Sequence, residues 1–408
     1  MNKYRGMTPK KILPALLGTV VEYYDYALYG LCAATLAQHF FPSEDMTVSL
    51  LKAYGVFAIG SLAKPLGAVF FGFLGDLKGR RFALQLSMIG IAVPTTVIAF
   101  LPDYHKWGWF APAILILCRF FQGFFVAGEA DGVALYVYEH VDKHRACFAN
   151  SLCHLASGSG IYLASYMIAQ NLDLGFQAPW RAPFLIGGLL GAGVLVLRQF
   201  ITETPEFVAA TIRAIEPFRL KLFLIVALLV GSIGGMYQFF FIFMPTYLVD
   251  LQLLAASDKA ATLSWMLLCY TFVSPFMGLL ADRLGQERLM KIFGFCMIVC
   301  GCMLSLGVLL GRIPLALLFL SAICLSGFHT PGFVVLAKHF PVHQRYRSLA
   351  IGHAVGSLVF SGSTPFVALY LYKVSNLPNL PFVYVVLLIS MGVMAVLSLE
   401  RMKKFARS

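Results

Sequence analysis

The chain has 408 residues, of which 59% are hydrophobic and 12% are charged, and its mean hydropathy is +0.80. A water-soluble fold of this length cannot bury so much apolar side chain, so the composition excludes soluble enzymes and soluble binding modules. The formal net charge of +12 comes from lysines and arginines spread over short connectors, which argues against a nucleic-acid partner.

Apolar stretches long enough to cross a hydrocarbon core of about 30 Å recur along the whole chain. Breaks at glycine, proline and charged clusters divide them into twelve predicted membrane-spanning helices. We expect these at residues 13–38, 49–73, 81–101, 109–136, 146–170, 181–200, 219–247, 260–281, 289–310, 314–336, 347–372 and 381–399. An all-α protein of this kind has the lipid bilayer as its main partner.

Twelve crossings place both termini on the same side of the membrane. Basic residues such as Lys78, Arg80, Arg81, Lys143 and Arg145 gather in the connectors of that side. Because cytoplasmic loops carry an excess of lysine and arginine, the pattern predicts cytoplasmic termini in a multi-pass protein of a bacterial inner membrane.

An internal repeat divides the chain near its middle. Gly72-Phe-Leu-Gly-Asp76-Leu-Lys-Gly79 follows the second span, and Gly278-Leu-Leu-Ala-Asp282-Arg-Leu-Gly285 follows the eighth with the same Gly, Asp and Gly spacing. The repeat predicts two six-helix bundles, at residues 1–200 and 219–408, joined by a cytoplasmic linker at 201–218. Two parallel repeats typically hold a solute site at their interface near the bilayer midplane.

Ionisable side chains at membrane depth are costly and are therefore functional candidates. Glu22 and Asp25 lie three residues apart in the first span and share one helical face. Arg119, near the middle of span four, cannot lose its charge and requires a partner, for which Asp25 lies at a matching depth. We expect Asp25, Arg119 and Glu22 to couple proton and solute movement. The alternative is a static ion pair that holds two helices together.

Lys64 lies near mid-membrane, where it could bind a solute carboxylate or pair permanently with Glu22 or Glu129. The aromatic and polar side chains of Tyr26, Tyr29, Tyr237 and Gln238 lie at comparable depth and are further candidates for solute contact. His154, His329 and His353 are also intramembrane. A single histidine in a helix bundle is more often a satisfied polar group, but we keep His329 and His353 as candidates.

The turn at Asp76, Gly79, Arg80 and Arg81 has the features of a gate. Glycine permits a tight reversal, and a carboxylate beside two arginines can make interhelical bonds that break when the cavity opens inward. Glu129 is expected to receive Arg80 or Arg81. No histidine, cysteine and carboxylate spacing at membrane depth indicates a metal site or a catalytic site.

The segment from Gly72 to Arg81 resembles the signature loop of the major facilitator superfamily. Within it, the chain is similar to the metabolite:proton symporters, which include proline/betaine, shikimate, citrate and 2-oxoglutarate carriers. The matching segments are Gly18–Gly30, Lys64–Gly67, Arg119–Gly123, Gly128–Glu129, Pro179–Phe184, Glu203–Phe207, Pro245–Leu248, Phe340–Tyr346 and Gly362–Pro365.

This resemblance implies a twelve-helix rocker-switch fold with a central cavity and cotransport with protons, without a cofactor beyond the proton gradient. It supports Asp25, Arg119 and Lys64 as site residues, and it adds Gln122 from the Arg119 motif. It also implies a second gate at Asp282 and Arg283, weakened because Gly285-Gln-Glu-Arg288 lacks the full basic signature.

The expected function is proton-coupled uptake of a small organic solute by a monomer. Two cations facing carboxylates favour a di- or tricarboxylate, a larger polycarboxylate chelator, or a zwitterion. The competing function is proton-coupled export of a drug or metabolite. Exporters of this fold typically carry a Gly-Pro pair in span five, and Ser157-Gly-Ser-Gly160-Ile-Tyr162 lacks one, which favours uptake.

Overall fold

The computed structural model describes residues 9–170, 179–210 and 220–405, and these ranges contain helices and no strand. Ten helical segments within them are long and apolar enough to cross a membrane. The other two predicted spans are also helical. They are α1 (Pro9–Leu31), continued by α2 (Ala33–Phe40), and α7 (Ala146–Ala169), and both carry more polar side chains. The predicted all-helical membrane fold is therefore confirmed.

The ten apolar segments follow the predicted spans closely. They are α3 (Met46–Leu77), α4 (Arg80–Phe100), α6 (Phe110–His140), α8 (Arg181–Arg198), α10 (Leu220–Gln238) with η2 (Phe239–Phe243) and α11 (Met244–Asp250), α12 (Lys259–Leu284), α13 (Gln286–Leu309), α14 (Leu315–His329) with α15 (Gly332–Ala337), α16 (Val342–Gly356) with η3 (Ser357–Ser361) and α17 (Thr364–Ser375), and α18 (Leu380–Phe405). Short helices α5 (Tyr104–Trp107), η1 (Lys143–Arg145) and α9 (Pro205–Ala209) lie between spans. The largest departure is at the last span, which was expected to end at 399 and continues to Phe405.

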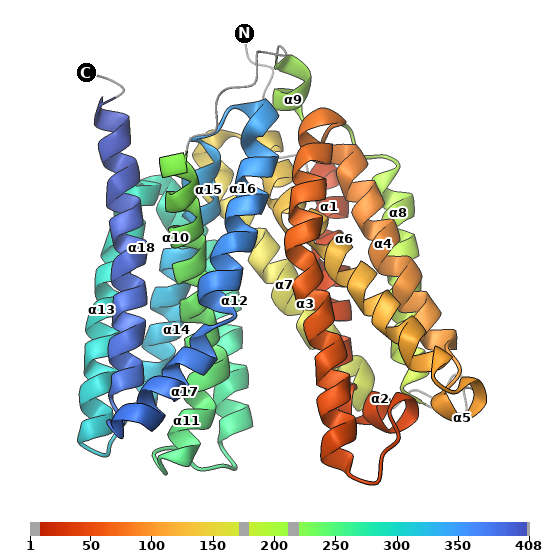
Figure 1. The fold of residues 1–408 in the computed structure, drawn as a ribbon. Coiled ribbons are helices and arrows are strands. Elements are labelled where there is room, and N and C mark those ends of the chain that lie inside the picture. Colours follow the sequence, from red (N-terminus) through yellow and green to blue (C-terminus); the bar gives the residue numbers. More distant parts are fainter. Residues whose placement is uncertain (1–8, 171–178, 211–219, 406–408) are drawn as a thin grey trace. The chain divides into compact units, whose positions relative to one another are not determined.

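The helices form two compact units (Figure 1). Unit 1 comprises Met1–Val141, Ala156–Ile212 and Val342–Ala350, and unit 2 comprises Asp142–Leu155, Arg213–Pro341 and Ile351–Ser408. Two helices are thus divided between the units: the first residues of α16 belong to unit 1 and the rest to unit 2, whereas the first residues of α7 belong to unit 2 and the rest to unit 1. The predicted linker at 201–218 includes α9, whereas its residues 211–218 lie outside the described part of the chain.

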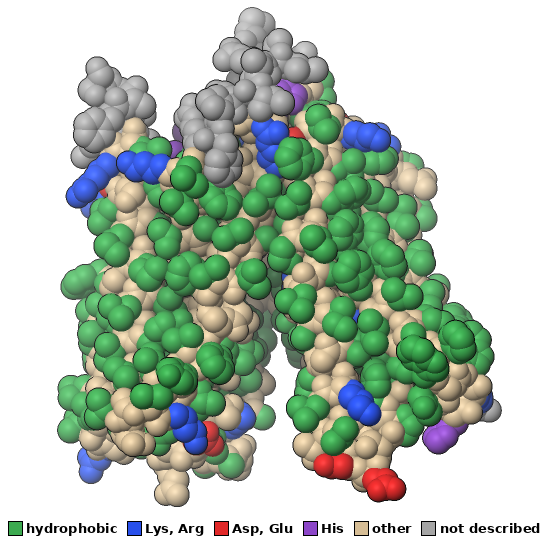
Figure 2. Space-filling model, in the orientation of Figure 1, with side chains coloured by type: hydrophobic (Ala, Val, Ile, Leu, Met, Phe, Trp, Pro, Cys, Tyr) green, Lys and Arg blue, Asp and Glu red, His purple; other side chains and the backbone are tan. Residues whose placement is uncertain are grey.

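The surface of each unit suits a lipid environment. Many large hydrophobic side chains are exposed, among them Leu62 at 65% in unit 1 and Phe295 at 66% in unit 2. On the visible face of each unit, hydrophobic side chains cover the middle, and lysines and arginines lie towards the helix ends (Figure 2). Such an apolar belt with charged ends is what a bilayer-spanning bundle requires.

In unit 1, α6 is the central helix and packs along α3, α4 and α1. Glycines bring α3 and α6 unusually close together. A Cβ at Gly123 would collide with the backbone of Gly60, and a Cβ at Gly67 would collide with the carbonyl of Phe124. Small residues let transmembrane helices approach at backbone distance, so this glycine contact sets the spacing on which the site described below depends.

In unit 2, α13 packs against α14 and α18, α10 packs against α18, and α12 packs against α14. Two spans are interrupted by a wider π-helical turn, η2 in the seventh span and η3 in the eleventh. Pro245 and Pro365 follow these turns within four residues. Since proline removes an amide donor and crowds the preceding turn, it accounts for the change of helical register at both places.

The two repeated turns have matching backbone geometry. Gly79 has a φ of 97° and Gly285 has a φ of 94°, in the left-handed region that glycine adopts without strain. Each aspartate accepts two backbone amides at the start of another helix. Asp76 accepts from Tyr346 and Arg347, and Asp282 accepts from Cys147 and Phe148, over 2.9–3.1 Å.

Candidate functional site

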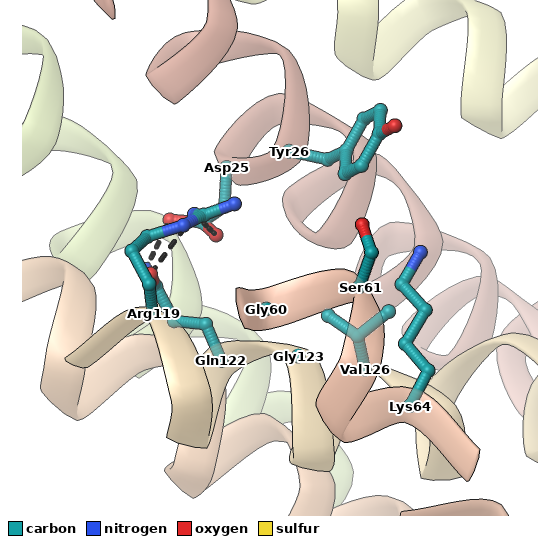
Figure 3. Close-up of a pocket in the computed structure, with 9 residues that line it drawn as sticks. All are labelled: Asp25, Tyr26, Gly60, Ser61, Lys64, Arg119, Gln122, Gly123 and Val126. Carbon is teal, nitrogen blue, oxygen red and sulfur yellow. Dashed lines mark hydrogen bonds and ion pairs between the residues drawn. The ribbon is translucent and has the colours of Figure 1, made fainter. Parts of the chain in front are cut away.

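A pocket in unit 1 brings together four of the nine residues that the sequence predicts for solute binding, together with Asp25. Its lining comes from α1, α3 and α6 (Figure 3): Asp25, Tyr26, Gly60, Ser61, Lys64, Arg119, Gln122, Gly123 and Val126. The close glycine contact between α3 and α6 places the lysine of one helix and the arginine of the other at the same pocket. Three of the lining residues carry a charged side chain: the cations Lys64 and Arg119 and the carboxylate Asp25.

Asp25 is held by three neighbours and is 2% exposed. Thr95 donates to its Oδ1 over 2.6 Å and Gln122 donates to the same atom over 2.7 Å, while Oδ2 lies 3.4 Å from Nη1 of Arg119. The predicted pairing of Asp25 with Arg119 is therefore present. Thr95 was not singled out from the sequence, because a hydroxyl in an apolar span gives no signal of its own until the helices are placed.

The Arg119 guanidinium is 4% exposed and is surrounded by aromatic rings as well as by Asp25. Its Cζ lies 4.4 Å from the centroid of Tyr29 and 5.5 Å from that of Phe57, and Nη1 donates to Oε1 of Gln122 over 2.9 Å. Its Nε has no hydrogen-bond partner in the described structure. One N–H of a buried cation is thus available beside the pocket.

Lys64 occupies the other side of the pocket. Its Nζ lies 5.0 Å from the centroid of the Tyr26 ring, and in Figure 3 it lies apart from the cluster of Asp25, Arg119 and Gln122. Lys64 makes no direct ion pair with any described residue, so the contact with Glu22 or Glu129 that the sequence left open is not formed, although the buried charge of Glu22 acts on Lys64 electrostatically.

Glu22 lies one helical turn before Asp25 and is 4% exposed. Its Oε2 has no hydrogen-bond partner among the described residues. The groups that act on it electrostatically include Glu129, Lys64 and Arg198. Glu22 is therefore a buried carboxylate near the pocket but not part of its lining.

The prediction that Glu129 receives Arg80 or Arg81 is wrong. Glu129 instead forms a buried ion pair with Arg198 of α8, whose Nη1 lies 2.8 Å from Oε2, and Ser87 donates to the same oxygen over 2.7 Å. Gly18 makes room for this pair, because a Cβ there would collide with both side chains. Arg198 ends α8, whose residues between Arg181 and Arg198 are all apolar, and a cation at the end of such a run was the available signal.

Arg80 pairs with Glu139 at the end of α6, with Nε 3.0 Å from Oε2, and with Asp76 at 3.3 Å. Arg345 completes the cluster, since its Nη1 lies 2.8 Å from Glu139 and 2.7 Å from Glu206 of α9. Glu139 was not predicted from the sequence, because this residue follows the end of the predicted span at 136, in a connector whose charged side chains were expected to face water.

Arg81 and the second turn have different contacts. Arg81 donates to the backbone carbonyl of Gln199 over 3.0 Å, and Arg283 makes no ion pair with the residues that the structure describes. The position equivalent to Arg81 is Glu287, which lies 2.6 Å from Lys338. The second turn therefore has a carboxylate, paired with a lysine, where the first turn has a guanidinium bonded to a backbone carbonyl.

The remaining predicted contacts lie in unit 2. Tyr237 packs on Phe241 and on Tyr270, with ring centroids 4.8 and 5.7 Å apart. Tyr270 is hydrogen-bonded to Nδ1 of His329. Gln238 follows Tyr237 at the end of α10 and is half-buried, as is His353 on α16.

Comparisons with known proteins agree with this architecture. The model of the Major Facilitator Superfamily matches residues 15–318 and 256–407. The chain is 31% identical to the glycine betaine/proline/ectoine/pipecolic acid transporter OusA of Dickeya dadantii (strain 3937), over 95% of this chain and 82% of that protein. It is 28% identical to the alpha-ketoglutarate permease of Escherichia coli (strain K12), over 97% and 94%.

Solved structures show the same fold. The proton:xylose symporter XylE bound to 6-bromo-6-deoxy-D-glucose superposes with a TM-score of 0.74 at 15% identity, over 96% of this chain and 95% of that one. The transporter FucP in its outward conformation gives 0.73 at 12% identity, over 96% and 99%. The chain therefore belongs to the Major Facilitator Superfamily and is a multi-pass membrane transporter, not an enzyme.

Proposed function

We propose that this transporter takes up a small carboxylate together with protons by alternating access. The observation that carries the proposal is the unpaired ammonium of Lys64. Among the residues lining the pocket, Arg119 has Asp25 as its counter-ion and Lys64 has none. A charged group in a bilayer-spanning bundle is strongly stabilised by an opposite charge, and a solute carboxylate supplies one.

The free Nε of Arg119 supports the same class of solute. The Nε–H group is buried away from water and has no acceptor in the described structure. Leaving a buried donor without a hydrogen bond costs roughly 1–3 kcal/mol of stability. A carboxylate with one oxygen on Lys64 and another near Arg119 would recover that loss. Two separated cations suit a solute with two or more carboxylates better than one with a single acid group.

A zwitterion such as a betaine is the second candidate solute, because one relative carries glycine betaine and proline. Quaternary ammonium groups are recognised by the faces of aromatic rings. The ring of Tyr26, which lines the pocket, faces Lys64, and the buried ring of Tyr29 faces Arg119 behind the pocket lining. Both rings are already occupied by protein cations, which favours the anionic solute.

Asp25 is proposed as the proton-linked group. While it is ionised, it holds Arg119 through Nη1; once protonated, it releases the guanidinium to a solute carboxylate. The two states compete for one cation, so that proton and solute binding become coupled. Glu22, buried one turn away, is a second carboxylate through which a proton could pass.

The Asp76 and Asp282 turns are proposed as gates. Each aspartate holds the start of another helix by two backbone amides, and Arg80, Glu139 and Arg345 add ion pairs beside the first. Such bonds must break and re-form in each transport cycle if the two ends of the pathway open in turn. The positive φ of Gly79 allows the first turn, and Arg81 holds the carbonyl of Gln199 beside it; Arg283 adds positive charge at the second turn. A bacterial inner membrane with cytoplasmic turns fits this positive charge.

A thermal-shift screen tests the solute class. Purified protein is heated with amino acids, betaines, aromatic acids and polycarboxylates, and we expect the di- and tricarboxylates to raise the melting temperature most. Stabilisation by betaines or neutral compounds alone would show that the carboxylate assignment is wrong. Uptake into right-side-out vesicles, against none into inside-out vesicles, separates import from the competing function of export.

A further inference from the structure

Unit 2 contains a polar cluster that the proposed function does not use. His154 on α7 and His329 on α14 lie with ring centroids 4.3 Å apart. Nδ1 of His154 lies 3.2 Å from Oγ of Ser274, and Nδ1 of His329 is hydrogen-bonded to the hydroxyl of Tyr270. Oγ of Ser274 also lies 3.2 Å from Oγ1 of Thr330. Both imidazoles are half-buried rather than sealed in packing.

The contacts leave one nitrogen of each ring available. Each imidazole uses Nδ1 for the hydrogen bond just described, and neither Nε2 makes a hydrogen bond to any described residue. A ring held by one nitrogen and open at the other is oriented to bind a further group. The two rings lie side by side, each with one nitrogen that no described residue occupies.

The titratable groups that face the pair carry no negative charge at neutral pH. Tyr270 comes from α12, His353 on α16 acts on His329, and Tyr237 on α10 packs against Tyr270. No carboxylate in the described ranges acts electrostatically on either imidazole. A proton that binds here therefore finds hydroxyl groups and imidazoles but no carboxylate counter-ion among the described residues, and an unpaired cation is costly in this environment.

We propose that the His154–His329 pair is a second solute subsite, which takes up one proton from water together with a carboxylate of the solute. The proton forms an N–H bond on one imidazole, and the carboxylate supplies the missing negative charge, so that each stabilises the other. Because two imidazolium ions this close repel each other, the pair holds one proton, not two. This inference rests on the proposed carboxylate transport and adds a proton to any that Asp25 carries.

Proton uptake on solute binding tests the subsite. Succinate, 2-oxoglutarate and tricarballylate are added to purified protein in weakly buffered solution at pH 8, where their carboxyl groups are ionised, and a pH indicator counts the protons taken up per bound acid. The wild type is expected to take up about one proton more per bound acid than the variant H154Q/H329Q. H105Q, the same change at an exposed histidine, is the control and should match the wild type.

A second measurement needs no variant. The affinity of the wild type for the same acids should weaken by up to tenfold per pH unit between pH 7 and pH 8, because binding requires a proton that becomes scarcer. A constant affinity over this range would overturn the proposal, as would equal proton uptake by the wild type and H154Q/H329Q; in both cases carboxylate binding itself would stand. If none of the acids binds the wild type, the proposed function fails, and the subsite with it.

Discussion

Lys64 provides the sharpest test of the solute class, because its ammonium has no ion-pair partner among the described residues. Replacing it with glutamine keeps a hydrogen-bond donor, on a side chain one atom shorter, but removes the charge. A hydrogen bond to a charged group is worth about 1.5–3 kcal/mol, so loss of the ion pair should raise the Kd for a dicarboxylate about 10- to 150-fold. Lys64→Arg, which keeps the charge, should remain within a few-fold of the wild type.

Two controls show whether a change in Kd comes from the lost charge of Lys64. Lys52, near the start of the same helix, is exposed, and Lys52→Gln should leave the Kd unchanged. The melting temperature of each variant without solute shows whether it is folded. Unchanged carboxylate affinity in a folded Lys64→Gln variant would refute the reasoning, because the excess cation of the pocket would then have no role in binding.

Three further variants test other parts of the structure. Asp76→Asn keeps one of two acceptor oxygens, so transport should slow while the solute Kd stays within a few-fold; a large loss of binding would show a direct role in the site. Gly60→Ala places a Cβ 3.0 Å from the carbonyl and 3.9 Å from Nε of Arg119, and should lower solute affinity at least tenfold, whereas Gly55→Ala, with open space around it, should not. Arg198→Met leaves Glu129 buried without its partner, which costs about 3–5 kcal/mol; this variant should melt well below the wild type, and adding Glu129→Gln should restore part of the loss.

The sequence predicts the fold well because bilayer length and hydrophobicity dictate it. A span must be about twenty apolar residues long and must satisfy its own backbone, so breaks in hydropathy locate helix ends to within a few residues. The repeated Gly, Asp and Gly spacing also predicts the matched turns at Gly79 and Gly285. The wider π-helical turns η2 and η3 were not predicted, since proline marks a disturbance but not its geometry.

The pocket was partly predictable for the same reason. A charge in an apolar span needs a partner, and Asp25 and Arg119 were the matching pair. The partner predicted for Glu129 was wrong because several cations lay at a similar depth along the spans. Only the packing of α6 against α8 selects Arg198 among them. The number of charges at membrane depth is visible in a sequence, but the choice among partners depends on helix rotation.

The central claim is that the Asp25 and Arg119 pair couples solute and proton movement. It is tested most directly by comparing two transport modes of Asp25→Asn in proteoliposomes. We expect this variant to accumulate much less solute than the wild type under a proton gradient, at most what a proton on the His154–His329 pair can drive, while it still exchanges labelled for unlabelled solute across the membrane. Accumulation by Asp25→Asn equal to that of the wild type would contradict the account, because Asp25 would then carry none of the coupled protons.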